Sequence, residues 1–391
     1  MNRFIVGGQT IVLNSLSPDL DRTFVDLYAA FFGGGALELS GFEDQVLAFF
    51  RQRGDPDPTP DYETHNKYFR NFTPIWRNLL GAGDHDGAER VWAELALGPV
   101  LAWEGRSREG SRIHKGTAYY FWGMTALRRG QLDKGYALMH QAVQEDICTF
   151  GVDNPNTPAM ALATLDYEKI DQAYRSWVLQ QRDFLEERIG DYSSTYSTRD
   201  FSLGAFKARF LDKPPKTEVV FLFAYVLARL KELGGLPEHG RQSVFAGQLE
   251  LTLLFNLALV TEEAIGAKNP NRKNRNRKNR NRGNFLKQAC FLLERADKPV
   301  KDLRRVNRAL DDEKFDRDEK FDRTVRELLD RDYRLDGVTL DPLQSDVALA
   351  YVLRNHGAHE VVAPRVVSER FPDIRQSLMN VLFAAVDYLY D

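Results

Sequence analysis

The sequence predicts a mainly α-helical protein, with a helical-hairpin array followed by a C-terminal helical bundle. Three observations predict this class. Apolar residues recur at helical spacing over most of the chain, and alternating patterns typical of strands are short and rare, chiefly near residues 4–13. Breakers such as the Pro-Pro pair at 214–215 separate the helical stretches. Helices with one apolar stripe bury it against one another, so a mainly α architecture follows.

Composition limits the class of protein further. The chain has 391 residues, of which 43% are hydrophobic, enough for two or three packed domains. The net charge is −3, so any nucleic-acid surface would have to be local. Cys148 and Cys290 form no motif for a disulfide framework or a zinc site, and His65, His114 and His140 lack metal-ligand spacing. We expect a cytoplasmic protein with no metal and no cofactor.

No segment predicts secretion or a membrane. The N-terminus lacks the apolar stretch of a signal peptide, and the longest apolar run, Val219 to Ala228, is too short to cross a bilayer. Residues 1–59 contain the short strand-like start and a glycine turn at 33–35. The glycine turn lacks the Lys-Ser/Thr of a phosphate loop, and the segment suggests no function.

Residues 60–190 predict an array of helical hairpins. The clearest hairpin extends from Gly116 to Ala142, with a small Gly123 where two helices would approach and Gly130 at the turn. This stretch is similar to a tetratricopeptide (TPR) repeat. A weaker copy has Gly83 at its turn. Two ordinary helical hairpins are the alternative interpretation. Either array would present a binding surface for a protein or small-molecule trigger.

A polar stretch at 191–216 predicts a linker, and we expect a further helical domain over 217–391. Two low-complexity insertions interrupt this domain, at 268–284 and 311–323. The first repeats Asn-Arg-Lys-Asn-Arg, and the second repeats Asp-Glu-Lys-Phe-Asp-Arg as residues 312–317 and 318–323. Perfect tandem copies suggest slippage of the coding sequence, and folds tolerate such insertions in exposed loops or at helix ends.

The informative motif of this domain ends a predicted helix. Asp341 is placed to cap this helix, Pro342 fits its first position and Gln344 completes a capping box. The helix then runs into Arg354-Asn355-His356-Gly357-Ala358-His359, and Pro364 precedes a final amphipathic helix. An arginine binds phosphate oxygens as a fork, and a histidine exchanges protons near neutral pH. Because RNA carries its own nucleophile, the 2′-OH, this pair suffices to cleave RNA without a metal.

The pattern Arg-Asn-x-x-Ala-His in this helical context resembles the HEPN superfamily of ribonucleases. The resemblance covers roughly 217–391 and implies that Arg354 and His359 are the catalytic pair, with Asn355 as an accompanying polar residue. It also implies a homodimer through the C-terminal domain. Val361 stands where HEPN toxins paired with small nucleotidyltransferases often have tyrosine, which disfavours that subgroup.

Geometry leaves two arrangements of the pair open. Asn355 and His359 share a helix face, whereas Arg354 and His359 diverge by about 140° on a regular helix. Gly357 could loosen the helix end and let the two converge, or two subunits could each supply a group. A purely structural alternative is that Arg354 and His359 cap the helix C-terminus, where cations are favourable.

The basic tract at 271–282 is a second candidate for RNA binding. It contains seven cations and no acid, so it could grip phosphates in a salt-sensitive way. It has no aromatic residue for base stacking, and a solvated loop is the favoured interpretation. The candidate RNA-binding residues are Arg272, Lys273, Arg275, Arg277, Lys278, Arg280 and Arg282.

Together these features predict a metal-independent endoribonuclease acting on single-stranded RNA, gated by its N-terminal array. By analogy with HEPN proteins, such an enzyme would serve prokaryotic defence or act as a toxin. The alternative is a non-catalytic interaction protein that uses the HEPN-like domain for dimerisation, RNA binding or nucleotide binding.

Overall fold

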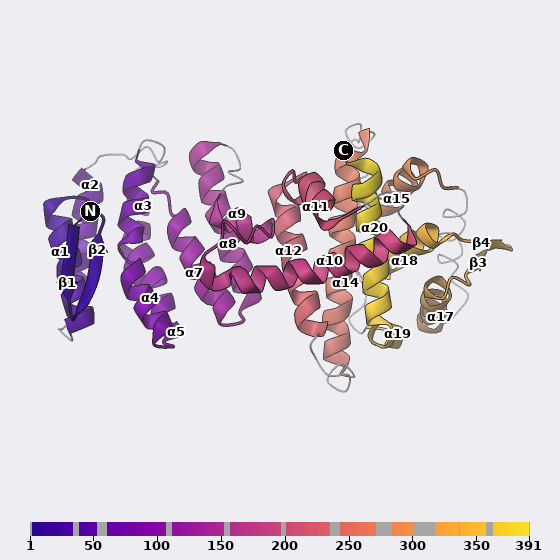
Figure 1. The fold of residues 1–391 in the computed structure, drawn as a ribbon, viewed down its shortest axis with the longest axis horizontal. Coiled ribbons are helices and arrows are strands. Elements are labelled where there is room, and N and C mark those ends of the chain that lie inside the picture. The colour runs from indigo at the N-terminus through magenta and orange to yellow at the C-terminus, as the bar shows by residue number, and fades with distance from the viewer. Residues whose placement is uncertain are drawn as a thin grey trace. The chain divides into compact units, whose positions relative to one another are not determined.

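The computed structural model describes residues 2–33, 39–52, 61–106, 112–151, 157–196, 201–234, 243–270, 284–299, 317–335, 337–356 and 363–390. Helices make up most of these residues, and the strands form two short antiparallel hairpins (Figure 1). The predicted mainly α fold class is therefore confirmed. No helix in the described ranges has the length and low charge needed to cross a membrane. The chain divides into two compact units, Met1–Met160 and Ala161–Asp391.

Unit 1 begins with a strand hairpin and continues with helices. Its elements are β1 (Asn2–Val6), β2 (Gln9–Leu13), α1 (Pro18–Gly33), α2 (Leu39–Gln52), α3 (Tyr62–Arg70), α4 (Thr73–Gly81), α5 (His85–Arg90), the π-helical η1 (Val91–Ala96), α6 (Leu97–Glu104), α7 (Gly116–Arg128) and α8 (Leu132–Phe150). The short helix α9 (Pro158–Ala163) spans the boundary between the units.

The β1–β2 hairpin turns through two glycines with positive φ, 56° at Gly7 and 77° at Gly8. Two positive φ values are typical of the tight turns that match strand twist. Gly7 has a second constraint, because an added Cβ would lie 2.4 Å from the carbonyl oxygen of Phe32 in α1. Close packing of the turn against α1 therefore requires glycine here, and the predicted strand-like start is confirmed.

The helical hairpin predicted over 116–142 is also confirmed. Helices α7 and α8 pack side by side, and Gly130 makes the turn between them with a φ of 72°. A Cβ on Gly123 would lie 3.1 Å from the carbonyl oxygen of Gly135, so the small residue permits the close approach. The similarity of this hairpin to a TPR repeat stays a prediction.

Aromatic side chains form the core of unit 1. Phe24, Tyr68 and Phe72 are almost fully buried, and their rings meet edge to face with centroids 5.2 to 6.0 Å apart. Edge-to-face packing adds to the burial of large apolar surfaces. Farther along, Trp76 donates a hydrogen bond from Nε1 to Thr125 Oγ1 at 2.8 Å, which ties α4 to α7.

Unit 2 is a bundle of longer helices. Its elements are the 3-10 turn η2 (Gln172–Tyr174), α10 (Arg175–Thr195), α11 (Leu203–Phe206), the π-helical η3 (Lys207–Leu211), α12 (Thr217–Gly234), α14 (Val244–Lys268), α15 (Asn284–Arg295), α17 (Arg317–Leu329), β3 (Arg334–Leu335), β4 (Val338–Thr339), α18 (Pro342–His356), α19 (Arg365–Glu369) and α20 (Phe371–Leu389).

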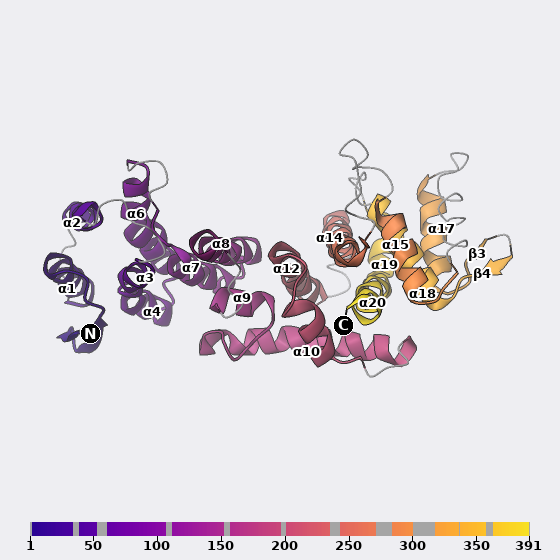
Figure 2. The ribbon, with the colours of Figure 1, turned by 90° about the horizontal axis from the view of Figure 1, so that it is seen from above.

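Helix α20 is the central element of unit 2. It packs against α10, α14, α15 and α18 (Figure 2). The sequence predicts one apolar stripe, which includes Ile374, Leu378 and Leu382, and these residues are buried. The structure goes further, because polar residues such as Asn380 and Asp387 on other faces of α20 are buried as well. A helix buried on every side requires hydrogen-bond partners for such groups.

The boundary of unit 2 differs from the expected domain start at 217. Most of the segment predicted as a linker over 191–216 belongs to the packed unit. Phe206 and Phe210 are fully buried and contact Phe223 of α12 at centroid distances of 5.6 and 6.0 Å. Helix α10, predicted as part of the hairpin array, packs on α12 and α20. Burial of these aromatic rings explains why the segment predicted as a linker belongs to the compact unit, which starts at Ala161.

Candidate functional site

The helix that carries the Arg-Asn-x-x-Ala-His motif begins as the sequence predicts. The Asp341 carboxylate accepts a hydrogen bond from the Gln344 backbone N–H at 3.0 Å. In return, the Asp341 N–H donates to Gln344 Oε1 at 2.9 Å. This reciprocal capping box fixes the start of α18. The Gln344 side-chain amide also donates to the carbonyl of Pro299 at 2.8 Å, and this bond connects the start of α18 to the segment that follows α15.

The orientation of α18 is set by its buried apolar face. Val347 and Ala350 face the core with at most 1% exposure, and Leu353 is fully buried. Tyr351 is half-buried, and its ring lies 6.4 Å from that of Phe285 in α15. The buried face contacts α14 and α20. Because this face is fixed, the helix presents Arg354 at its C-terminal end toward α14.

Arg354 is held from two directions by α14. Its Nε donates a hydrogen bond to Glu262 Oε2 at 3.2 Å, and its guanidinium lies 4.8 Å from the ring centre of Phe255. A guanidinium is attracted to an aromatic face, so the two contacts together hold the fork against α14. About a quarter of the side chain remains exposed. Among the described residues, the terminal nitrogens make no hydrogen bond.

Of the other motif residues, the structure describes Asn355 but not His359. Asn355 is exposed and follows Arg354 in the last turn of α18. His359 lies outside the described residues, as do Gly357 and Ala358. The structure thus positions one of the two predicted catalytic groups. The chain is described again from residue 363, where Ala363 and Ser368 pack against the first turns of α14 near Gly247.

Glu262 and Phe255 are site residues that the sequence did not reveal. They precede Arg354 by roughly ninety residues and lie on a different helix. One signal was present. Glu262 lies in a mostly apolar stretch from Leu251 to Ile265, whose other polar residues are Thr252, Asn256, Thr261 and Glu263, and its side chain is only 10% exposed. A carboxylate buried on an apolar helix requires a cationic partner, and arginine is the usual one.

The structure describes part of the second low-complexity insertion but none of the basic tract in the first. The candidate RNA-binding residues Arg272, Lys273, Arg275, Arg277, Lys278, Arg280 and Arg282 all lie outside the described residues. By contrast, the second copy of the acidic repeat, residues 318–323, forms the first turns of α17. Its Phe321 is buried, with 6% of its surface exposed. A helix end is one of the two places where the sequence led us to expect the repeats.

A second cluster of ionisable side chains lies inside unit 1, around residue 114. His114 Nε2 lies 3.5 Å from Asp146 Oδ1, and its Nδ1 lies 3.0 Å from Thr149 Oγ1. The backbone N–H of His114 donates to Nδ1 of His65 at 3.1 Å. Glu145 adjoins this group and pairs with Arg112 at 2.5 Å. All but Arg112 are nearly fully buried, so we interpret this cluster as a polar network that holds residues 112–116 against α8.

Burial shifts the two central groups in opposite senses. Desolvation lowers the pKa of His114 to about 4, and desolvation together with the neighbouring Glu145 raises the pKa of Asp146 to about 6. Between pH 6.5 and 4 the folded state binds fewer protons at His114 than the unfolded state, so stability falls as pH falls. Between pH 6 and 3.8 it binds more protons at Asp146, so stability rises as pH falls.

We therefore expect the two contributions to offset each other in the wild type. Asp146→Asn removes the offsetting group, so the variant should lose about 1 kcal/mol more stability than the wild type between pH 7.5 and pH 5. Urea unfolding at both pH values measures this difference. His114→Gln should show the reverse dependence. Equal pH dependence in all three proteins would show that the pair does not titrate as described.

Comparison of the chain with protein families, curated proteins and solved structures finds no significant match.

Proposed function

We propose that this protein is a metal-independent endoribonuclease of HEPN type that cleaves single-stranded RNA. The observation that carries the proposal is the state of Arg354. Its Nε pairs with Glu262 and its guanidinium lies over the Phe255 ring, while the terminal nitrogens have no partner among the described residues. A guanidinium held in this way is preorganised to bind two phosphate oxygens. The motif places His359 five residues after it.

The chemistry assigns a separate role to each group. His359 takes the proton from the 2′-OH of the nucleotide before the scissile phosphate, and the freed oxygen attacks phosphorus. Arg354 stabilises the charge that develops on the phosphoryl oxygens. The bond to the 5′-oxygen of the next nucleotide breaks and this oxygen takes up a proton from water, so the products carry a 2′,3′-cyclic phosphate and a 5′-hydroxyl. Asn355, exposed beside Arg354, is available to the RNA.

Resemblance to HEPN proteins supports two further features of this proposal. The active species would be a homodimer through the C-terminal unit, in which two motifs meet. Activity would be held in check until a trigger binds the N-terminal unit, as in defence or toxin systems. These features rest on family analogy.

The test is cleavage of a 5′-labelled, unstructured RNA by the full-length protein in EDTA. We expect residual cleavage by the wild type even without its trigger, products with 2′,3′-cyclic ends, and no cleavage by His359→Ala. His356→Ala is the matched control, since it removes a histidine three residues away. Equal cleavage by wild type and His359→Ala would refute the assignment. Absence of cleavage by all proteins would contradict an ungated nuclease.

The second candidate function is a non-catalytic interaction module. The Arg354–Glu262 pair favours it, since such a pair also serves to anchor a helix end on its neighbour. In that role Arg354 would contribute to stability and RNA would remain intact. If tight nucleotide binding is lost in Arg354→Ala while RNA stays uncleaved, the module is a nucleotide sensor.

A further inference from the structure

One edge of the β1–β2 hairpin is unpaired. Val6 pairs with Gln9 across the two-residue turn, so the backbone groups of Gln9, Ile11 and Leu13 point toward β1. Those of Thr10 and Val12 point to the other side. In the part of the chain that the structure describes, these outward N–H and C=O groups have no hydrogen-bond partner. An exposed strand edge of this kind is a template for another strand.

The next outward position on the same edge shows how it can be occupied. The backbone N–H of Asn14 donates to Asn71 Oδ1 at 2.8 Å, and its carbonyl accepts from Asn71 Nδ2 at 2.9 Å. The Asn71 amide thus makes the two bonds that a neighbouring strand would make. Thr10 and Val12 are the two preceding outward positions on this edge.

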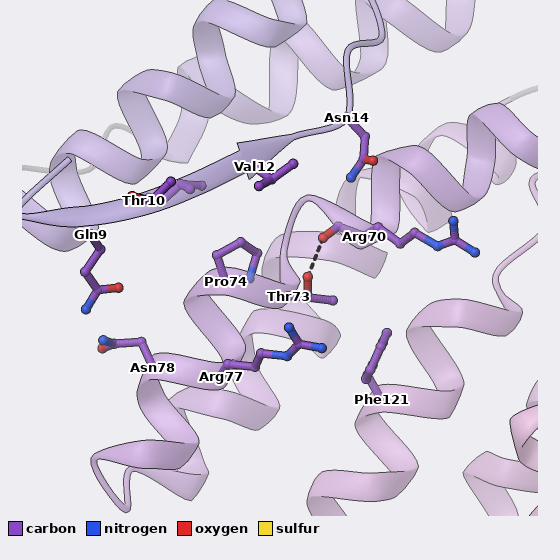
Figure 3. A pocket seen from close by; sticks show the side chains of 11 residues that line it. Gln9, Thr10, Val12, Asn14, Arg70, Thr73, Pro74, Arg77, Asn78 and Phe121 are labelled. Carbon is purple, nitrogen blue, oxygen red and sulfur yellow. Dashed lines mark hydrogen bonds between the residues drawn. The ribbon is translucent and has the colours of Figure 1, made fainter. Parts of the chain in front are cut away.

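A groove of about 630 Å³ lies along this edge (Figure 3). One wall is β2, and the facing wall is the end of α3 and the first turns of α4, where Pro74 and Asn78 lie opposite the strand. Phe121 of α7 also lines it. The groove belongs entirely to unit 1. A strand added to β2 would therefore enter a space that already exists.

The groove is positively charged. Arg70 and Arg77 line it, both are exposed, and neither has an acidic partner in the described part of the chain. None of the described residues that line it is an aspartate or a glutamate. Figure 3 shows the Arg77 guanidinium extended toward Phe121, with Arg70 on the same side. Two unpaired arginine forks in a groove without carboxylates favour an anionic ligand.

We propose that this groove binds an acidic, extended segment of a partner protein, which adds to β2 as a third strand. Its backbone pairs with Thr10 and Val12, and its carboxylates bind Arg70 and Arg77. A peptide fits these features better than RNA for two reasons. RNA cannot satisfy alternating strand N–H and C=O groups. The ring of Phe121 is also engaged already, stacked on Trp92 at 5.2 Å and packed against Trp76, and so offers less surface to a base.

The test uses the full-length protein and a fluorescent twelve-residue peptide of alternating glutamate and valine. We expect saturable binding, and at least a tenfold loss of affinity in Arg70→Ala/Arg77→Ala, since charge-assisted hydrogen bonds are lost. Arg128→Ala, an exposed arginine of α7 outside the groove, is the matched control and should bind normally. The same peptide with N-methyl groups on alternate residues keeps its charge but cannot pair as a strand, so it should bind at least tenfold more weakly.

Hydrogen exchange provides an independent readout of strand addition. The amides of Thr10 and Val12 should become protected when the peptide binds, while the thermal unfolding of the double variant should match that of the wild type. Equal binding of the N-methylated peptide would overturn the added strand. Tighter binding of oligouridine, also lost in the arginine variant, would make the groove a nucleic-acid site. Absence of peptide binding up to millimolar concentration would overturn the proposal. None of these outcomes depends on RNA cleavage.

Discussion

Replacement of Arg354 by alanine should lower the rate of RNA cleavage about 10²–10³-fold, the loss expected when a preorganised phosphate-binding group is removed. Arg354→Lys should also lose at least about tenfold, because lysine keeps the charge toward Glu262 but lacks the planar fork. Single-turnover cleavage of labelled RNA measures both. Arg365→Ala is the matched control, since Arg365 is a highly exposed arginine on α19 that pairs with Glu369. Its cleavage rate should stay at the wild-type value.

Stability must be separated from catalysis in this experiment. Arg354→Ala leaves the Glu262 carboxylate without its partner, and this side chain is only 10% exposed. We expect a loss on the order of 1–3 kcal/mol in the free energy of unfolding from the unpaired charge. Arg354→Met combined with Glu262→Gln removes both charges and should restore much of that stability without restoring cleavage. If the double variant cleaves RNA, Arg354 acts in packing and not in the reaction.

Asp346→Ala is expected to destabilise unit 2 by about 3–5 kcal/mol, the range for breaking a buried charged network. Asp346 is fully buried near the start of α18. Its carboxylate lies 2.7 Å from Arg331, and it accepts hydrogen bonds from Tyr196 at 2.6 Å and from Asn380 at 3.0 Å. Burial and the charge of Asp346 raise the pKa of Tyr196, so this hydroxyl remains a donor. Alanine would leave the Tyr196 hydroxyl and the Asn380 amide without this acceptor, and it would remove the ion-pair partner of Arg331.

Urea unfolding of the full chain measures this loss. Asp346→Asn should cost less than alanine, because the amide keeps the shape and one acceptor oxygen while it loses the charge. Asp332→Ala is the matched control, because it removes an exposed aspartate next to Arg331 in the sequence. We expect it to change the free energy of unfolding by no more than about 0.5 kcal/mol. A loss from Asp346→Ala below 1 kcal/mol would show that the network adds little to the packing of α10, α18 and α20.

Local chemistry explains which features the sequence could predict. The capping box of Asp341 and Gln344, and the turn at Gly130, depend on residues within a few positions of each other. Such features can be predicted from the sequence because they require no contact with a distant part of the chain. The strand-like start near residues 4–13 is local in the same way. The mainly α class follows from periodicity, which is a property of each segment alone.

The remaining features depend on contacts between distant segments. The segment predicted as a linker joins unit 2 because Phe206 and Phe210 pack on Phe223, and nothing in the polar stretch at 191–200 indicates that contact. The partners of Arg354, which are Glu262 and Phe255, lie on α14, and a six-residue motif contains no information about such distant partners. The groove along β2 is formed where the β1–β2 hairpin lies beside the end of α3 and the start of α4. Nothing in the sequence indicated that these distant segments lie side by side, and residues 1–59 had no predicted function.

The acidic repeat that opens α17 has a consequence for how this gene can change. Copies 312–317 and 318–323 are identical, so loss or gain of one six-residue unit upstream leaves the sequence from Asp318 onward intact. The buried Phe321 would keep its neighbours, and Arg326 would keep its pairing with Glu369. A replication error at this site therefore alters the length of the chain while the packed helix is preserved.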